Sequence, residues 1–415
     1  MRPLAASNAI LNGDRHPTEI RETSPMCEPT NDSTSTSTTT VGIPRVRWLD
    51  HGIEHSALWR SESGWPAPAS VVTGDDSMTA ETALRLASTG TAILWTGDFH
   101  NAKQLLAAMG KRLGTPVPPR NDDITAAFQR SRVDALRRST LLGMLLVPVS
   151  ADGTIPLRRS PDIRQAIAHA WGPAIEASVV SLRELLGVIG AEEWRTRGVD
   201  VPALGAKIHP HYGVFSPVRG EYLDLVANAP LPPDAATAFD IGTGTGVLAA
   251  LLAHRGIRHI VATDQDPRAL ACATENLDRL GFGPAVTVEK TDLFPGGRAD
   301  IVACNPPWIP ATPKVATDYA VYDEGGRMLA GFLSGLAEHL TPDGEGWLVI
   351  SDIAERLGLR SRGDLLDAIE DAGLAVIARM DTRPTHSRAT DRTDPLNAAR
   401  AAEVTSLWRL RADRP

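Results

Sequence analysis

A glycine-rich loop near the middle of the 415-residue chain is the feature that most restricts its fold. The loop, residues 242–246 with the sequence Gly-Thr-Gly-Thr-Gly, follows a short apolar run at 237–241 and precedes a helical pattern that begins at Val247. Glycines at these positions let the chain turn tightly and let a ligand approach the backbone closely. The order of strand, loop and helix therefore indicates a sheet that binds a nucleotide-like cofactor, and a plain strand-to-helix turn is the alternative interpretation.

The residues around this loop extend the pattern into a whole domain. From Gly205 onward, apolar strands alternate with amphipathic helices, which is typical of a parallel sheet with helices on both faces. We expect strands at 237–241, 259–263, 286–290, 301–304, 345–351 and 374–380, and a closing seventh strand at 404–411. The predicted fold class is α/β, with a Rossmann-like seven-stranded domain over residues 205–415.

The first half of the chain shows a different pattern. Residues 1–42 are rich in Ser, Thr, Pro and Asn and predict a disordered tail, because they offer little apolar surface to bury. Residues 43–200 predict a helix-rich N-terminal domain, because apolar residues recur at three- and four-residue spacing. The expected helices are 79–88, 101–113, 124–136, 163–170 and 174–189, with short strands at 91–95 and 144–149.

Composition excludes some classes of protein. No apolar run approaches the roughly 20 residues of a membrane helix, and the N-terminus lacks the apolar core of a secretory signal. The three cysteines, Cys27, Cys272 and Cys304, are too few and too scattered for a disulfide framework or a zinc site. We therefore expect a cytoplasmic protein without a metal. The net charge of -8 argues against a chain coated in nucleic acid, although it leaves a local basic face open.

Acidic residues lie at or just after the carboxyl ends of three of the predicted strands. Asp264 ends the second strand, where it can accept hydrogen bonds from both hydroxyls of a ribose, which suits NAD and S-adenosylmethionine equally. Asp240 either attracts the ammonium of a cofactor's amino acid moiety or caps the loop. Asp292 and Leu293 either face an adenine or, for Asp292, cap a turn. The candidate cofactor-binding residues are Asp240, Gly242, Gly244, Gly246, Asp264, Asp292 and Leu293.

The tetrapeptide Asn305-Pro306-Pro307-Trp308 follows the fourth strand, at the carboxyl end where open sheets bind ligands. A planar amide or aryl amine is a poor nucleophile until its N–H bonds are oriented. The Asn305 side-chain oxygen and the Pro306 carbonyl can accept those hydrogens, and Trp308 can stack on the planar group. We therefore predict Asn305, Pro306 and Trp308 as catalytic residues and Pro307 as a further substrate contact.

This chemistry distinguishes methyl transfer from hydride transfer, because a nicotinamide enzyme has no evident use for such a set of acceptors. The alternative interpretation of the tetrapeptide is a rigid turn with an anchoring tryptophan. With the glycine loop and Asp264, the tetrapeptide predicts S-adenosylmethionine as the cofactor and a planar nitrogen as the methyl acceptor.

These residues resemble the class I methyltransferases that modify amides and amino groups, among them the release-factor and ribosomal-protein glutamine methyltransferases and the adenine amino methyltransferases of DNA and RNA. The family's Asn-Pro-Pro-Tyr motif usually ends in Tyr or Phe, and Trp308 keeps the stacking face. Residues 213–221 are similar to the family's F-x-P-R-x-E pattern but contain an inserted Val218. The resemblance implies that Phe215 and Arg219, together with Pro217 and Glu221, lie beside the cofactor and the substrate.

The resemblance also bears on the substrate. The glutamine enzymes carry a small helical N-terminal domain that recognises the substrate protein, and the first half of this chain is similar in general architecture. The leading hypothesis is methylation of a glutamine side-chain amide in a protein. Methylation of the exocyclic amine of adenine in RNA or DNA, and methylation of a small molecule, are the alternatives.

Two further groups of side chains have both a functional and a structural interpretation. The basic residues are Arg112, Arg120, Arg130, Arg132, Arg137 and Arg138, which either hold phosphates of RNA or form a solvated helix face among interleaved acids. His209 and His211 are too few for a zinc site, and we expect a structural role for them.

Overall fold

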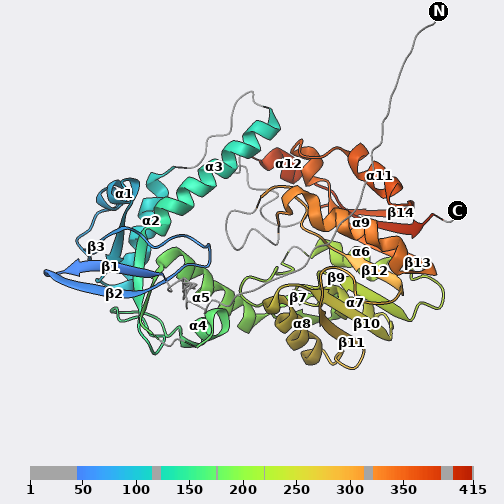
Figure 1. Ribbon diagram of the computed structural model, residues 1–415, viewed down its shortest axis with the longest axis horizontal. Coiled ribbons are helices and arrows are strands. Elements are labelled where there is room, and N and C mark those ends of the chain that lie inside the picture. Colours follow the sequence, from blue (N-terminus) through green and yellow to red (C-terminus); the bar gives the residue numbers. More distant parts are fainter. Residues whose placement is uncertain are drawn as a thin grey trace, which may run out of the picture. The chain divides into compact units, whose positions relative to one another are not determined.

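The computed structural model describes residues 44–114, 123–173, 176–218, 220–312, 321–384 and 396–413. The predicted tail, residues 1–42, lies outside these ranges. Within them the strands form three sheets, of six, seven and two strands (Figure 1). The seven-stranded sheet carries the glycine loop and the tetrapeptide, and the six-stranded sheet is built from the first half of the chain.

The seven-stranded sheet confirms the sequence prediction for the second half. Its strands are β9 (Thr237–Ile241), β10 (His259–Asp264), β11 (Val286–Lys290), β12 (Ala299–Cys304), β13 (Leu340–Ser351), β14 (Leu374–Thr382) and β15 (Thr405–Ala412). They lie in the order β11-β10-β9-β12-β13-β15-β14. All neighbours from β11 to β13 run parallel, whereas β15 runs antiparallel to both β13 and β14.

This strand order determines where a ligand can bind. The chain leaves β9 toward β10 on one side and later returns to place β12 on the other side of β9. The connections therefore diverge at the carboxyl ends of β9 and β12, which is the point where open α/β sheets form a binding crevice. The glycine loop follows β9 and the tetrapeptide follows β12, so both are brought to this point.

Helices cover both faces of the seven-stranded sheet (Figure 1). One face carries α6 (Glu221–Asn228), α7 (Val247–His254) and α8 (Pro267–Arg279). The other carries α9 (Arg327–His339) and α11 (Arg362–Asp371), and the short α10 (Ile353–Arg356) and α12 (Asn397–Ala401) pack together. In α8, Asp266 caps the helix and Pro267 occupies its first turn, as the sequence indicates.

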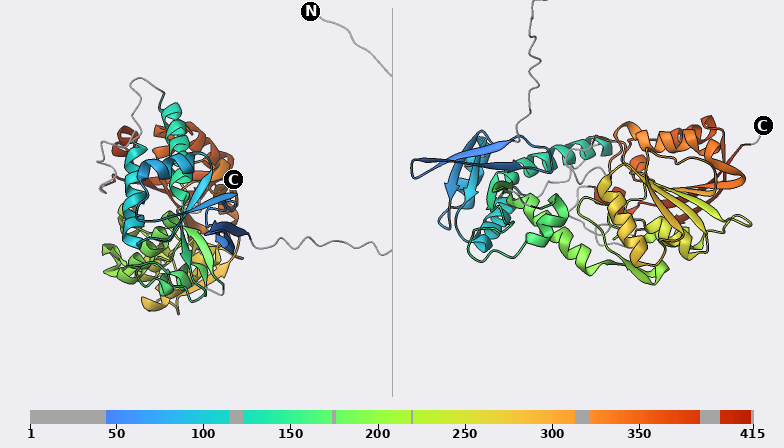
Figure 2. Two further views of the ribbon diagram at one scale, coloured as in Figure 1. Left: turned by 90° about the vertical axis from the view of Figure 1, so that its left-hand side faces the viewer. Right: turned by 60° about the horizontal axis from the view of Figure 1, so that its bottom comes forward.

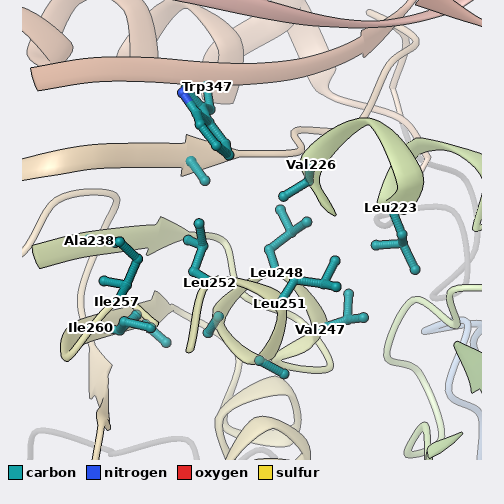
Figure 3. Packing of buried hydrophobic residues seen from close by; sticks show 14 of the residues in the cluster. Leu223, Val226, Ala238, Val247, Leu248, Leu251, Leu252, Ile257, Ile260 and Trp347 are labelled. Carbon is teal, nitrogen blue, oxygen red and sulfur yellow. The ribbon is translucent and has the colours of Figure 1, made fainter. Parts of the chain in front are cut away.

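Successive side chains along each strand point to opposite faces of the sheet. Because helices cover both faces, there is a buried hydrophobic cluster on each face. In β13, Trp347 faces the cluster under α6 and α7, whereas Leu348 faces the cluster under α9. Figure 3 shows Trp347 beside α7, whose Leu248, Leu251 and Leu252 are buried together with it. Because α7 is buried along most of its length, the loop that precedes it is held on a rigid base.

The first half of the chain corrects the prediction of a helix-rich domain. It is an α/β region on a six-stranded sheet, in the order β1-β2-β6-β5-β4-β3. The strands are β1 (Arg45–Asp50), β2 (Ile53–Arg60), β3 (Ser70–Gly74), β4 (Thr91–Trp95), β5 (Leu145–Val149) and β6 (Ser178–Ser181). The edge strands β1 and β3 lie close to each other, so the sheet is nearly closed into a barrel.

The helices of this region cover that sheet instead of packing only on one another. They are α1 (Ala80–Ser88), α2 (Phe99–Arg112), α3 (Ile124–Gly143), α4 (Arg164–Trp171) and α5 (Leu182–Arg197). Four of them match predicted helices, but the helix expected at 174–189 begins only at Leu182, because β6 comes first. The short strands expected at 91–95 and 144–149 are β4 and β5.

Several described contacts join the two halves of the chain. Two short strands, β7 (Val199–Val201) and β8 (Ala206–Ile208), form the third sheet between them. Arg195 of α5 forms a 2.6 Å ion pair with Glu275 of α8. On α3, Phe128 packs with Ile309 and Ile353 in one buried cluster. Figure 2 shows α3 as a long continuous helix.

Among the described helices, none is long and apolar enough to cross a membrane.

Candidate active site

A cavity of about 320 Å³ lies at the carboxyl ends of the parallel strands. Its lining brings together residues that are far apart in the sequence: Gly242 after β9, Asp264 at the end of β10, Leu293 after β11, and Asn305 after β12. The volume lies within the usual range for small-ligand sites. The strand order thus places most of the predicted cofactor and tetrapeptide residues around one space.

The three loop glycines have positive φ angles and distinct surroundings. At Gly246 (φ +79°) a Cβ atom would lie 3.2 Å from the Ala273 backbone, so this glycine allows α7 to pack closely on α8. At Gly244 (φ +55°) a Cβ atom would have nothing within 4 Å. Gly242 and Gly244 line the cavity and Gly246 does not. The loop therefore combines close helix packing with open backbone that a ligand can approach.

Asp240 is buried behind the loop. The sequence left two roles open for it, contact with the cofactor or capping of the loop, and its contacts are those of the capping role. Its Oδ2 accepts hydrogen bonds from Thr243 Oγ1 at 2.6 Å and from the Ala249 N–H at 3.0 Å. Its Oδ1 has no hydrogen-bond partner among the described residues. Burial raises the pKa of Asp240 to about 6, against the effect of these two hydrogen bonds. Asp240 is outside the set of residues that line the cavity.

Asp264 lies at the cavity wall with its carboxylate held by backbone donors. Oδ2 accepts from Gly244 N–H at 3.1 Å, and Oδ1 accepts from Asp266 N–H at 3.0 Å. Burial raises the pKa of Asp264, and the hydrogen bonds oppose that shift. Gln265, which the sequence analysis passed over, lines the cavity beside it. Each carboxylate oxygen retains a lone pair for a ligand hydroxyl.

Asp292 and Leu293, predicted together, are separated by the structure. Leu293 lines the cavity, whereas the Asp292 side chain is 59% exposed and pairs with Arg327 at 3.6 Å. Asp292 also accepts a hydrogen bond from Gln265 Nε2. The neighbouring Thr291 lines the cavity instead. Asp292 is therefore connected to the cavity through Gln265 and Arg327, which both line it.

All four residues of the tetrapeptide line the cavity. The Trp308 indole Nε1 donates a 2.9 Å hydrogen bond to Asn305 Oδ1. A carboxamide oxygen has two lone pairs, so this bond orients the Asn305 side chain and leaves one acceptor position available. The sequence analysis assigned only stacking to Trp308, and this second interaction follows from the indole N–H, which Tyr and Phe lack.

Tyr222 on α6 is a further cavity residue that the sequence analysis missed. It is 3% exposed, lines the cavity, and its hydroxyl forms a hydrogen bond with the Asn305 side chain. Burial raises the pKa of Tyr222 well above its ordinary value, so the hydroxyl stays protonated. Its position directly after Glu221, in the segment similar to the family pattern, was the available signal.

The predicted substrate neighbours are only partly described. Phe215 lines the cavity, as does Val214 before it, whereas Arg219 lies outside the described residues. At the opposite end of the chain, Arg400 and Glu403 also line the cavity. Glu403 is 5% exposed and accepts a 2.6 Å hydrogen bond from Ser351 Oγ. Neither had a motif in the sequence to mark it.

The two histidines are held by protein groups. His209 Nδ1 lies 2.6 Å from the Arg195 carbonyl oxygen, and His211 Nε2 lies 2.8 Å from Glu275. Over the described ranges, no group of three or more His, Cys, Asp or Glu side chains gathers in a way that could hold a metal ion.

The arginines that the sequence analysis grouped together have different partners in the structure. Arg132 donates to the Thr312 carbonyl and lies 4.2 Å from the Tyr322 ring centroid, and Arg138 donates to the carbonyls of Gly110 and Gly114. Arg120 lies outside the described residues. Arg132 and Arg138 are therefore bound to the protein's own backbone.

Comparison with known proteins agrees with this geometry. The family model described as "Methyltransferase small domain" matches residues 205–360. A release factor glutamine methyltransferase of Cereibacter sphaeroides is 32% identical over 169 residues, which are 37% of this chain and 59% of that protein. A ribosomal protein L11 methyltransferase of Pelotomaculum thermopropionicum is 34% identical over 145 residues, which are 34% of this chain and 39% of that protein.

Further similarities extend the range of named substrates and include solved structures. A tRNA1(Val) (adenine(37)-N6)-methyltransferase of Shewanella loihica is 27% identical over 194 residues, which are 42% of this chain and 74% of that protein. The crystal structure of a ribosomal protein L11 methylase from Lactobacillus delbrueckii subsp. bulgaricus covers 47% of this chain and 79% of that chain, with 16% identity and a TM-score of 0.33.

The chain spans 59% and 39% of the length of the first two of these relatives, and all of the similarity to the family model lies in its second half. The methyltransferase family implies S-adenosylmethionine as the cofactor. Residues 205–360 are a methyltransferase small domain, distantly homologous to the release factor glutamine and ribosomal protein L11 methyltransferases.

Proposed function

We propose that this protein transfers the methyl group of S-adenosylmethionine to a planar nitrogen, and that the acceptor is the side-chain amide of a glutamine in a protein. One observation carries the proposal: a single cavity is lined by the glycine loop, by Asp264 and by the whole tetrapeptide from Asn305 to Trp308. The first two groups suit the cofactor, and the third suits an acceptor that presents two N–H bonds.

In this proposal the cofactor lies along the glycine loop. Gly242 and Gly244 allow close approach, and Gly246 keeps the loop on α7 and α8. Asp264 accepts hydrogen bonds from the ribose hydroxyls, and Leu293 provides an apolar wall for the adenine. Asp240 contributes by holding Thr243 and the first turn of α7, and Asp292 contributes through Gln265.

The acceptor amide lies against the tetrapeptide. Asn305 Oδ1, already oriented by Trp308 and Tyr222, accepts one amide hydrogen, and the Pro306 carbonyl accepts the other. This alignment directs the nitrogen lone pair at the methyl carbon, so positioning supplies much of the rate. The bound cofactor supplies an electrophilic sulfonium methyl. The transfer would form a nitrogen–carbon bond, leave the sulfur–carbon electron pair on sulfur, and release one amide proton to solvent.

The first half of the chain is proposed to recognise the substrate protein. The support is that α3 packs against the segment following the tetrapeptide, through Phe128 with Ile309 and through Arg132 with Thr312. The segment next to the acceptor position is therefore supported from behind by the first half of the chain.

Methylation of the exocyclic amine of adenine is the second candidate, because adenine also presents two N–H bonds on a planar nitrogen. The similarity to a tRNA adenine-N6 methyltransferase favours it, and Trp308 could stack on a base. A small-molecule nitrogen is the third candidate.

A labelling experiment separates these candidates. The protein is incubated with methyl-labelled S-adenosylmethionine and cell extract, and the products are digested with either protease or nuclease. We expect label that survives nuclease and is released by protease as methylated glutamine. Label that is released only by nuclease would establish the adenine alternative instead.

Replacement of Asn305 tests the proposed alignment. We expect Asn305→Ala to lower the methyl-transfer rate at least a hundredfold, because one acceptor of the amide hydrogens is lost. Cofactor affinity, measured by equilibrium dialysis, should stay within roughly tenfold, which is about 1.4 kcal/mol. Retained turnover in this variant would contradict the proposed role of Asn305.

A further inference from the structure

A second cavity, of about 440 Å³, adjoins the candidate active site. Gly213 and Val214 line both cavities, so they form a common wall. Most of the remaining lining comes from the first half of the chain, including the segment after β2 and the first residues of α5. Its aromatic side chains are Trp59, Trp65, Trp194 and Tyr212.

Arg183 is the residue that gives this cavity a charge preference. It lies in the first turn of α5, and its Nη1 donates a hydrogen bond to Ser139 Oγ. No acidic side chain in the described part of the chain forms an ion pair with it, and the residue retains solvent-exposed surface. Desolvation and the nearby Arg138 lower the pKa of Arg183, and Glu184 opposes that shift. A cation in the first turn of a helix is also unfavourable to the helix dipole.

The acidic residues of the cavity are occupied by other partners. Glu62 forms a 3.0 Å ion pair with Arg268, and Glu184 accepts hydrogen bonds from Ser61 Oγ and from the N–H of Glu62 at 3.1 Å. The buried hydroxyl of Ser216 has no hydrogen-bond partner among the described residues. The cavity thus offers a ligand one guanidinium without an acidic partner within the described ranges, next to broad aromatic surface.

We propose that this second cavity binds an acidic side chain of the substrate protein, with Arg183 pairing with the carboxylate and the tryptophans packing against a neighbouring apolar side chain. The proposal rests on the proposed function, because it places this side chain on the same substrate whose glutamine enters the first cavity. Of the described residues that line this cavity, Arg183 is the single Lys or Arg, so it suits one carboxylate better than the series of phosphates in a nucleic acid backbone.

Two short peptides that differ by one charge test the cavity directly. Acetyl-Trp-Glu-amide and acetyl-Trp-Gln-amide are titrated into the full-length protein by isothermal titration calorimetry. We expect the glutamate peptide to bind at least tenfold more tightly than the glutamine peptide. Equal affinities in the wild-type protein would overturn the proposal, whatever any variant shows.

Variants locate the charge preference. Arg183→Met should remove the preference and bind both peptides equally, whereas Arg85→Met, which deletes an exposed arginine on α1, should leave the preference intact. Arg183→Gln serves the same purpose if the methionine variant does not fold, as judged by circular dichroism. A preference that persists in the folded Arg183 variant would overturn the proposal.

Peptide binding and methyl transfer are measured in separate experiments, so that failure of this inference can be distinguished from failure of the proposed function. Binding of S-adenosylmethionine is measured independently and should be unchanged in Arg183→Met. Peptide discrimination without any methyl transfer would leave this inference intact and count against the proposed function. Methyl transfer without discrimination between the two peptides would support the proposed function and overturn this inference. Binding of hexauridylate that depends on Arg183, in place of peptide binding, would also overturn the proposal.

Discussion

At the scale of single residues, the bond between Trp308 and Asn305 matters most. Because the indole N–H occupies one lone pair of the Asn305 oxygen, the acceptor position is oriented before any ligand arrives. Positioned hydrogen-bond acceptors need no reorganisation during the reaction, which favours the transition state. The ring of Trp308 therefore has two separable properties, a flat face and a donor.

A substitution can separate them. We expect Trp308→Phe to keep the stacking face and lower kcat for methyl transfer about three- to tenfold, because a hydrogen bond of about 1 kcal/mol that orients Asn305 is lost. Cofactor affinity should not change. Steady-state kinetics with the acceptor held at saturation measure the effect, and an unchanged kcat would show that the donor is irrelevant.

Asp240 leads to a prediction about pH. Its pKa rises from 3.8 to about 6 on folding, so between these values the native state holds a proton that the unfolded state has lost. The stability contributed by this proton is present below about pH 4 and is lost as the pH rises through 6. The free energy of unfolding of the wild type should therefore fall relative to Asp240→Asn, by about 2–3 kcal/mol between pH 4 and pH 7.

Urea denaturation at several pH values measures this difference. Any effect of Asp240→Asn on the free energy of unfolding that is independent of pH cancels, because only the change in the difference between the two proteins with pH is used. Parallel stability curves for the two proteins would contradict the raised pKa of Asp240.

The sequence predicted most of the site at this scale, because the residues of a loop or tetrapeptide are contiguous. Gly242, Asp264 and Asn305 could be assigned to one cavity from strand order alone. Tyr222 had only its position after Glu221 as a signal and Glu403 had none, because each reaches the cavity from a segment whose position depends on packing. Whether Asp240 faces the cavity or the loop also depends on which face of β9 carries α7.

At the scale of elements, the glycine loop offers a matched set of variants. Gly246→Ala should destabilise the protein by about 2–4 kcal/mol, since its φ is +79° and the new Cβ would lie 3.2 Å from the Ala273 backbone. Gly244→Ala has free space and should cost about 1 kcal/mol, but its Cβ would obstruct the cofactor and lower affinity roughly tenfold. Thermal melts and equilibrium dialysis measure the two effects.

Gly256→Ala is the control for these variants. It has φ +96°, nothing within 4 Å of a new Cβ, and a position outside the cavity lining. It should show backbone strain without loss of cofactor affinity. A similar loss of affinity in Gly256→Ala would show that strain, and not obstruction, explains the effect at Gly244.

Element prediction succeeded where periodicity was sustained and failed where strands were short. The strands around the cavity are apolar runs separated by clear helices, so their pattern is unambiguous. In the first half, β6 has only four residues and runs directly into α5, so its apolar residues were included in one long helix. The hairpin of β1 and β2 was missed because β2 mixes charged and apolar residues and four of its eight residues are exposed.

At the scale of the whole molecule, α3 connects the two sheets. Phe128 is 2% exposed and packs among residues that follow β12 and β13. We expect Phe128→Ala to lower the free energy of unfolding by about 3 kcal/mol and to slow methyl transfer more than it weakens cofactor binding. Val133→Ala on the same helix, at a side chain that is 60% exposed, should have little effect on either.

Denaturant melts and initial rates measure both consequences. Unchanged turnover in a destabilised Phe128→Ala protein would show that α3 supports the fold without shaping the acceptor side of the cavity. The sequence could not indicate this contact, because amphipathic periodicity shows that a helix has an apolar face but not which part of the chain covers it.

The wall formed by Gly213 and Val214 links the occupancy of the two cavities. A displacement of these two residues would reshape both spaces together, so a molecule that moves them from one side would alter the affinity of the other side. Thermodynamic linkage makes such an influence mutual and equal in free energy. A cofactor in the first cavity and a substrate segment in the second would then change each other's affinity by the same factor, whichever of them binds first.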